Sequence, residues 1–114
     1  MNRKLFLAVC AACFAMQAGL HAADAKPKTV IHVISIQWKS GATPAQIAEV
    51  LKGAEALPAQ YPGITHVWTK PIKKQLPEGY SHLIVMEFAN EDALKNYADS
   101  AAQKKWYQVY MPLR

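Results

Sequence analysis

The chain has 114 residues, 52% of them hydrophobic, and its 13 lysines and arginines outnumber its 8 aspartates and glutamates to give a formal charge of +5. This length corresponds to one domain and excludes a multidomain architecture. The first 25 residues differ in composition from the rest, so they are considered separately before the charge is interpreted.

Residues 1–22 are predicted to be a secretory signal peptide. Arg3 and Lys4 provide a basic start, and residues 5–18 carry no charge. This apolar run is shorter than the roughly 18–20 residues that a membrane-spanning helix needs. Small residues follow, and cleavage after Ala22 or as late as Ala25 satisfies the small-residue rule. We therefore expect a periplasmic or secreted protein, with residues 23–28 as a flexible leader and no transmembrane segment after cleavage.

Removal of the signal peptide changes the interpretation of the cysteines and of the charge. Cys10 and Cys13 both lie in the apolar run, so their C-x-x-C spacing does not indicate a redox motif. A lipoprotein is the alternative, because residues 7–10 loosely resemble a lipid-attachment box, but Val9 is large for that position. Loss of Arg3 and Lys4 lowers the formal charge to +3, which is ordinary for a soluble protein. Because exported proteins rarely meet nucleic acid, we expect no nucleic-acid partner.

The mature chain begins with a strand, a helix and a second strand. Residues 29–39 are rich in β-branched residues, and their even positions are mostly apolar, which predicts a strand with one apolar face. Thr43, Pro44 and Gln46 form a helix start, with a capping threonine, a proline at the first helical position and a capping-box glutamine. The helix is expected to end near Pro58, and residues 64–72 alternate again as a second strand.

The second half of the chain predicts a hairpin followed by a helix. Residues 73–79 contain a proline and a glycine and indicate a long loop, and residues 80–89 predict the third strand. Asn90 is expected to cap a second helix whose pattern continues to the end of the chain. The order β-α-β-β-α predicts an α+β fold, a ferredoxin-like plait with its final strand apparently missing. We expect the third strand between the other two, helices on one face, and a second copy on the other.

The chain contains five short motifs in a defined order: Ile31–Ile34, Leu57–Pro58 with Tyr61–Ile64, Gly79–His82, Met86–Phe88, and Ala93, Leu94 and Tyr97. Together they make the sequence similar to the stress-responsive A/B barrel (Dabb) family. This resemblance implies a single domain over residues 29–114, with two ferredoxin-like protomers forming a dimeric α/β barrel. Most members have no established activity, and the clearest enzyme among them, the plant olivetolic acid cyclase, is distantly similar to this chain.

Two features depart from the family's pattern. The family usually carries His-Pro-x-His after the tyrosine of the second helix, whereas residues 100–103 read Ser-Ala-Ala-Gln. In the plant cyclase, the second of those histidines pairs with the tyrosine that matches Tyr97 as the acid/base couple. The amide of Gln103 does not titrate near neutral pH and cannot replace it. The family also continues beyond Pro112–Leu113 into a final strand, so we expect either a truncated chain or a domain without that strand.

The resemblance and the alternation pattern define a candidate pocket between the sheet and the helices. His32 and Tyr97 are the candidate catalytic residues. The alternatives are a hydrogen-bonded histidine at a strand end and an aromatic side chain that belongs to the core. The candidate ligand-binding residues are His32, Ile34, Ile36, Val67, Ile84, Met86, Tyr97, Gln103 and Trp106.

The other two histidines of the domain are expected outside this pocket. His66 and Trp68 should lie on the opposite face of the sheet, at the dimer interface. His82 should lie several residues from His32 along an antiparallel pair, too far for the two to share a metal ion. We expect no metal site and no cofactor, because the sequence has no Gly-rich phosphate loop, nucleophile elbow or zinc motif.

The sequence therefore favours an exported dimeric protein that binds a small apolar molecule or plays an accessory role in stress. The alternative is a cofactor-free enzyme of the polyketide cyclase or monooxygenase type that uses His32 and Tyr97. The amide at position 103 argues against that alternative, because only a titratable group can transfer a proton.

Overall fold

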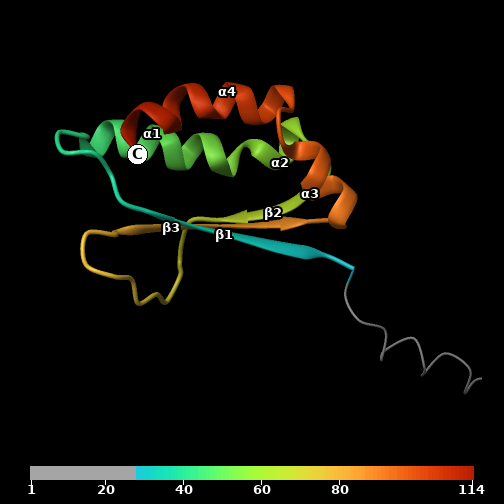
Figure 1. Ribbon diagram of the computed structural model, residues 1–114, viewed down its shortest axis with the longest axis horizontal. Helices are drawn as coiled ribbons and strands as arrows, with labels where there is room; N and C mark the ends of the chain where they lie inside the picture. Colours follow the sequence, from blue (N-terminus) through green and yellow to red (C-terminus); the bar gives the residue numbers. More distant parts are fainter. Residues whose placement is uncertain (1–27) are drawn as a thin grey trace, which may run out of the picture.

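The computed structural model describes residues 28–114 as one layer of sheet covered by one layer of helices (Figure 1). The predicted signal peptide, and all of the predicted leader except Lys28, lie outside the described residues. In the described part, no helix is both long enough and apolar enough to cross a membrane.

The sheet contains β1 (Val30–Ile36), β2 (Ile64–Trp68) and β3 (His82–Phe88) in the order β1-β3-β2. Strand β3 is antiparallel to both neighbours, as the sequence predicts. His32 lies opposite Met86, and Ile34 lies opposite Ile84. The α+β, ferredoxin-like fold class is thereby confirmed. Strand β2 ends at Trp68 and β3 begins at His82, so both are shorter than their alternation patterns indicate.

The helices all lie on one face of the sheet (Figure 1). Helix α1 (Pro44–Glu55) begins with the predicted capping box, in which Thr43 and Gln46 exchange hydrogen bonds. The last helix was expected to continue from Asn90 to the end of the chain, and this is wrong: Asp99 has a φ of 62° and breaks it into two. The other helical segments are α2 (Leu57–Gln60), α3 (Glu91–Tyr97), α4 (Ala101–Tyr110) and the 3₁₀ turn η2 (Met111–Leu113).

The core fills the space between the helices and the face of the sheet toward them, which we call the inner face. Ile84, Met86 and Phe88 of β3 are fully buried there, and each such side chain contributes about 1.5–3 kcal/mol to folding. The indole nitrogen of Trp106 donates a buried hydrogen bond of 2.9 Å to the Val50 carbonyl, which joins α4 to α1. The most buried side chains are Phe88, Ile36, Leu57, Ile64, Ile84, Met86 and Val50.

The opposite side of the sheet, the outer face, carries exposed apolar side chains. Ile31 is 52% exposed, Val33 55% and Trp68 39%. Leu83 and Val85 lie opposite Ser35 and Val33 in the register and therefore share this face. Exposed apolar patches of this kind mark interaction surfaces.

Replacement of Trp106 by Phe tests the link between α1 and α4. The variant loses the hydrogen bond to Val50 and part of the stacking on Tyr110, whose ring centroid lies 4.6 Å away. We expect the free energy of unfolding, measured in urea, to fall by about 1–3 kcal/mol. Lys105→Ala, at the exposed neighbouring position, is the control and should change it by less than about 0.5 kcal/mol. Equal effects of the two substitutions would contradict the assigned role of Trp106.

Candidate functional site

The structure divides the predicted pocket residues into core and rim. Ile36, Ile84, Met86, Tyr97 and Trp106 are buried in the hydrophobic core. The half-buried residues among the candidates are Ile34, Val67 and Gln103, and His32 is exposed. The buried apolar candidates are therefore part of the hydrophobic core next to the candidate site, and they do not line an open cavity.

Tyr97, the last residue of α3, has a buried hydroxyl group with no hydrogen-bond partner in the structure. Its ring packs between Phe88 and Tyr61, with centroids 5.4 Å and 5.5 Å away. The Tyr61 hydroxyl donates to the Ala93 carbonyl at 2.6 Å and is thereby engaged elsewhere. An unpaired hydroxyl in the interior lowers the stability of the fold by about 1–3 kcal/mol, so the presence of tyrosine at position 97 needs an explanation.

Burial, with a smaller contribution from Tyr107, raises the pKa of Tyr97 well above its ordinary value. The phenol therefore stays protonated at neutral pH. It can donate a hydrogen bond to an oxygen atom, but it cannot act as a general base there.

Gln103 is held at both ends of its amide. Its Oε1 accepts a hydrogen bond from the Asp99 backbone N–H at 2.7 Å, and its Nε2 donates to the Tyr107 hydroxyl at 3.2 Å. Since the Tyr107 oxygen accepts from Gln103, its own hydrogen is free to donate to another group. Gln103, at the position where the family usually carries the acid/base histidine, thus orients a second phenol, that of Tyr107.

Tyr107 is a site residue that sequence reasoning missed. It lies four residues after Gln103 on α4, and this spacing puts two side chains on the same helical face. That spacing, read together with the unusual amide at 103, is the signal that could have found it.

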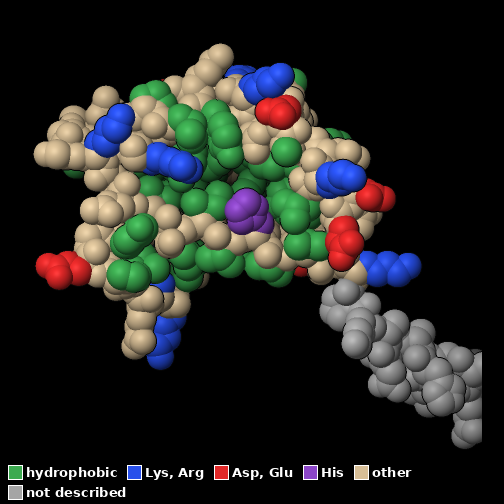
Figure 2. All heavy atoms as spheres, viewed as in Figure 1, with side chains coloured by type: hydrophobic (Ala, Val, Ile, Leu, Met, Phe, Trp, Pro, Cys, Tyr) green, Lys and Arg blue, Asp and Glu red, His purple; other side chains and the backbone are tan. Residues whose placement is uncertain are grey.

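His32 lies on the inner face near the same cluster, separated from Tyr97 by Phe88. Its ring stacks on Phe88 with centroids 6.4 Å apart and planes inclined by 28°. On the side shown in Figure 2, hydrophobic side chains surround a histidine between the helices and the sheet. The two candidate catalytic residues contact the same phenyl ring, and no hydrogen bond between them is formed.

The other two histidines of the described residues have partners of their own. The His82 Nδ1 accepts a hydrogen bond of 2.8 Å from the Trp38 indole. His82 lies opposite Ile36, whereas His32 lies opposite Met86, four residues further along β3. Burial, and then the charge of Lys74, lower the pKa of His82 and favour its neutral form. Among residues 28–114, no three His, Cys, Asp or Glu side chains gather as a metal site would require.

His66 and Trp68 are on the outer face, and their rings stack 5.3 Å apart.

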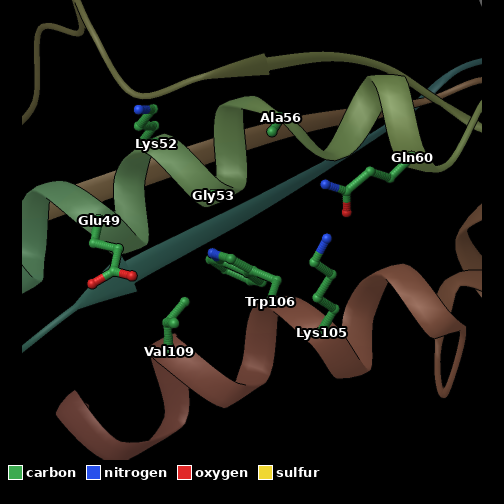
Figure 3. A pocket seen from close by; sticks show the side chains of 8 residues that line it. All are labelled: Glu49, Lys52, Gly53, Ala56, Gln60, Lys105, Trp106 and Val109. Atoms are coloured by element: carbon green, nitrogen blue, oxygen red, sulfur yellow. The ribbon is translucent and has the colours of Figure 1, made fainter.

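Two hollows border parts of the predicted pocket. A cavity of about 390 Å³ beside β1 is lined by Ile34, Ile36, Tyr80, Tyr110 and Arg114, among others. Another, of about 370 Å³, lies in the seam between α1 and α4 and includes Trp106 (Figure 3). In the second hollow, Lys105 and Gln60 point toward each other across the seam. Neither hollow contains His32, Tyr97 or Gln103.

Comparisons with known proteins identify relatives of the fold. The model of the family described as Stress responsive A/B Barrel Domain matches residues 30–114. The chain is similar to the crystal structure of an Arabidopsis thaliana protein, with 23% identity and a TM-score of 0.61 over 74% of this chain and 84% of the other. No curated protein sequence matches significantly.

Two further solved structures share the fold at lower identity. A dimeric ferredoxin-like protein of unknown function from Thermobifida fusca has 20% identity and a TM-score of 0.61, over 75% of this chain and 80% of the other. The hydroxynitrile lyase of Passiflora edulis has 18% identity and a TM-score of 0.63, over 76% and 84%. At these identities, the likeness concerns the fold alone.

Replacement of Tyr97 by Phe tests whether its hydroxyl is unsatisfied. Because the variant removes a buried polar group that has no partner, we expect the free energy of unfolding to rise by about 1 kcal/mol or to stay unchanged. Tyr61→Phe, which loses the bond to Ala93, is the matched control and should lower it by about 1 kcal/mol. Urea denaturation of both variants makes the comparison. Equal destabilisation by the two would mean that Tyr97 has a partner.

Proposed function

The chain belongs to the stress-responsive A/B barrel domain family, and from this premise we propose that it is an exported homodimer whose protomers each bind a small, largely apolar molecule. The observation that carries the proposal is the buried Tyr97 hydroxyl without a partner. A ligand oxygen would supply the missing acceptor, so that the cost of the unpaired group in the free protein is recovered on binding.

The chemistry of the cluster defines the class of ligand. Tyr97 and Tyr107 both offer phenolic hydrogens, and the Gln103 amide is already engaged. The ring of Phe88 contacts both Tyr97 and His32 and gives the cluster an apolar wall. Such a site suits an apolar body that carries an acceptor oxygen, as in a ketone, an ester or an enol. Because the Tyr97 hydroxyl is closed off from solvent, we expect the half-buried Tyr107 side chain to move when the ligand enters.

The enzyme alternative, a cofactor-free cyclase or monooxygenase using His32 and Tyr97, has less support. The raised pKa of Tyr97 disfavours its phenolate, and Phe88 separates it from His32. The similarity to a hydroxynitrile lyase at 18% identity carries no activity over to this chain. Turnover of a linear polyketide-like substrate by the wild type, abolished in Tyr97→Phe, would favour the enzyme over the binding protein.

A pair of probes that differ only in an acceptor oxygen tests the binding proposal. Octanophenone presents one carbonyl oxygen beside an alkyl chain, whereas octylbenzene has the same shape without it. We expect the wild type to bind the ketone about tenfold or more tightly, and Tyr97→Phe to lose this preference, since the difference reports one buried hydrogen bond of about 1–3 kcal/mol. Tyr80→Phe, an exposed tyrosine outside the cluster, should keep the preference.

Titration calorimetry or native mass spectrometry measures both affinities in each variant. Equal binding of the two probes by the wild type, or a preference that survives Tyr97→Phe, would contradict the proposed site. His32→Ala should weaken ketone binding to a smaller degree, since its ring stands at the edge of the phenyl wall.

Export is the part of the proposal that rests on the sequence of residues 1–25. The basic Arg3 and Lys4 and the uncharged run that follows support it. Expression in a bacterial host should give a mature protein whose N-terminus lies after Ala22 or as late as after Ala25. N-terminal sequencing of the purified protein decides this, and a cytoplasmic product that retains Met1 would contradict it.

The homodimer is supported by the apolar outer face and by similar structures that are described as dimeric. A face that exposes Ile31, Val33 and Trp68 would be covered when two sheets pack together. The second copy would then remove from water an apolar surface that the three-stranded sheet leaves open.

A further inference from the structure

The outer face contains one polar cluster within its apolar surface. The imidazole Nδ1 of His66 lies 2.8 Å from the Oε1 of Glu87, and the Thr65 hydroxyl donates to the same carboxylate oxygen. The His66 side chain is 63% exposed and that of Glu87 22%. The carboxylate is therefore already shielded on the side of the sheet, and the imidazole is not.

The local backbone explains why two side chains of β2 reach one carboxylate. The pairing of β2 with β3 shifts register between Ile64 and His66, which are opposite Phe88 and Glu87. The extra residue at this irregularity is Thr65, whose hydroxyl also lies 3.2 Å from the Glu87 carbonyl oxygen. A bulge of this kind redirects a side chain from its regular face.

The immediate surroundings of the cluster are apolar. The His66 ring stacks on Trp68, with centroids 5.3 Å apart and planes inclined by 14°. In the register, Trp68 lies opposite Val85, and β1 contributes Ile31 and Val33 to the same face. A second copy that covers these side chains would also take the carboxylate of Glu87 out of water.

We propose that the cluster of Thr65, His66 and Glu87 controls how tightly two copies of the chain pair through their outer faces, and that pairing strengthens when His66 gains a proton. This inference rests on the proposed homodimer. A carboxylate that loses its water needs a compensating charge, and the protonated imidazole of His66 is the cation placed to supply it. The neutral imidazole can still donate a hydrogen bond to Glu87, but it leaves the negative charge uncompensated.

The direction of the pH dependence follows from this charge balance. The Thr65 hydroxyl, and then the His66 ring, hold the pKa of Glu87 below its ordinary value and favour its ionised form. Burial of this anion in the dimer favours a positive charge on the imidazole 2.8 Å away, so pairing takes up protons. The dissociation constant must then fall as pH is lowered through the range in which histidine titrates.

Other titratable groups near this face do not produce the same dependence. Among the described strand residues, β1 contributes no ionisable side chain to the outer face, and β3 contributes Glu87 alone. The connection between β2 and β3 runs on the outer side of the sheet and carries Lys70, Lys73, Lys74 and Glu78 (Figure 1). These are residue types other than histidine, and histidine is the side chain that changes charge near neutral pH.

Sedimentation equilibrium of the purified protein between pH 5.5 and 8.5 tests the proposal. We expect the dimer dissociation constant to rise by about tenfold or more across this range, since each proton taken up on pairing changes the constant by up to about tenfold per pH unit. His66→Gln keeps a hydrogen-bond donor without a titration and should abolish the change. Glu87→Gln should also abolish it and should leave the dimer no weaker at pH 8.5.

His32→Gln is the matched control, because His32 is an exposed histidine on the inner face, and it should keep the wild-type dependence. For a dimer too tight to dissociate by dilution, subunit exchange between light and ¹⁵N-labelled copies, followed by native mass spectrometry, replaces the equilibrium measurement. A dimer whose stability does not depend on pH, or whose dependence survives His66→Gln, would overturn this inference and leave the homodimer standing. A monomer at all pH values would overturn both.

Discussion

Burial of the inner face of β3 under the helices is the constraint on which the rest of the structure depends. Ile84, Met86 and Phe88 are completely buried, and β3 is the strand that pairs with both others. A three-stranded sheet has few positions from which to build a core, so the positions at which its central strand meets the helices must be apolar. The helices supply the cover, and the indole of Trp106 fixes α4 against α1 above it.

The candidate site adjoins this core at Phe88, the last residue of β3. The phenyl ring contacts both Tyr97 and His32, so it fixes the position of a buried donor and of an exposed imidazole at once. Gln103 then completes the cluster by orienting Tyr107. Such a cluster favours recognition over proton transfer, because its buried phenol is kept protonated and its amide has no titration in the physiological range.

The order of elements and the strand register were predictable from the sequence, because alternation with a period of two and capping residues are local signals. Thr43 with Gln46 and the pairing of His32 with Met86 are examples. The break at Asp99 was missed, although the chain carries a local signal for it: Ser100 caps a new helix, and its hydroxyl accepts from the Gln103 backbone N–H. The contacts of Gln103 with Tyr107 and of His66 with Glu87 depend on helix placement and on a shifted register, which alternation alone does not give.

The alternation of β3 also keeps the two proposed surfaces apart. Phe88 points toward the tyrosines on the inner face, and its neighbour Glu87 points toward His66 on the outer face. A substitution at Glu87 therefore changes the outer face without altering the core or the buried donor. A substitution at Phe88 would change the core, the wall between His32 and Tyr97, and the strand that presents Glu87. The exposed residues His66 and His32 separate the two surfaces experimentally, because neither takes part in the core and each belongs to one face only.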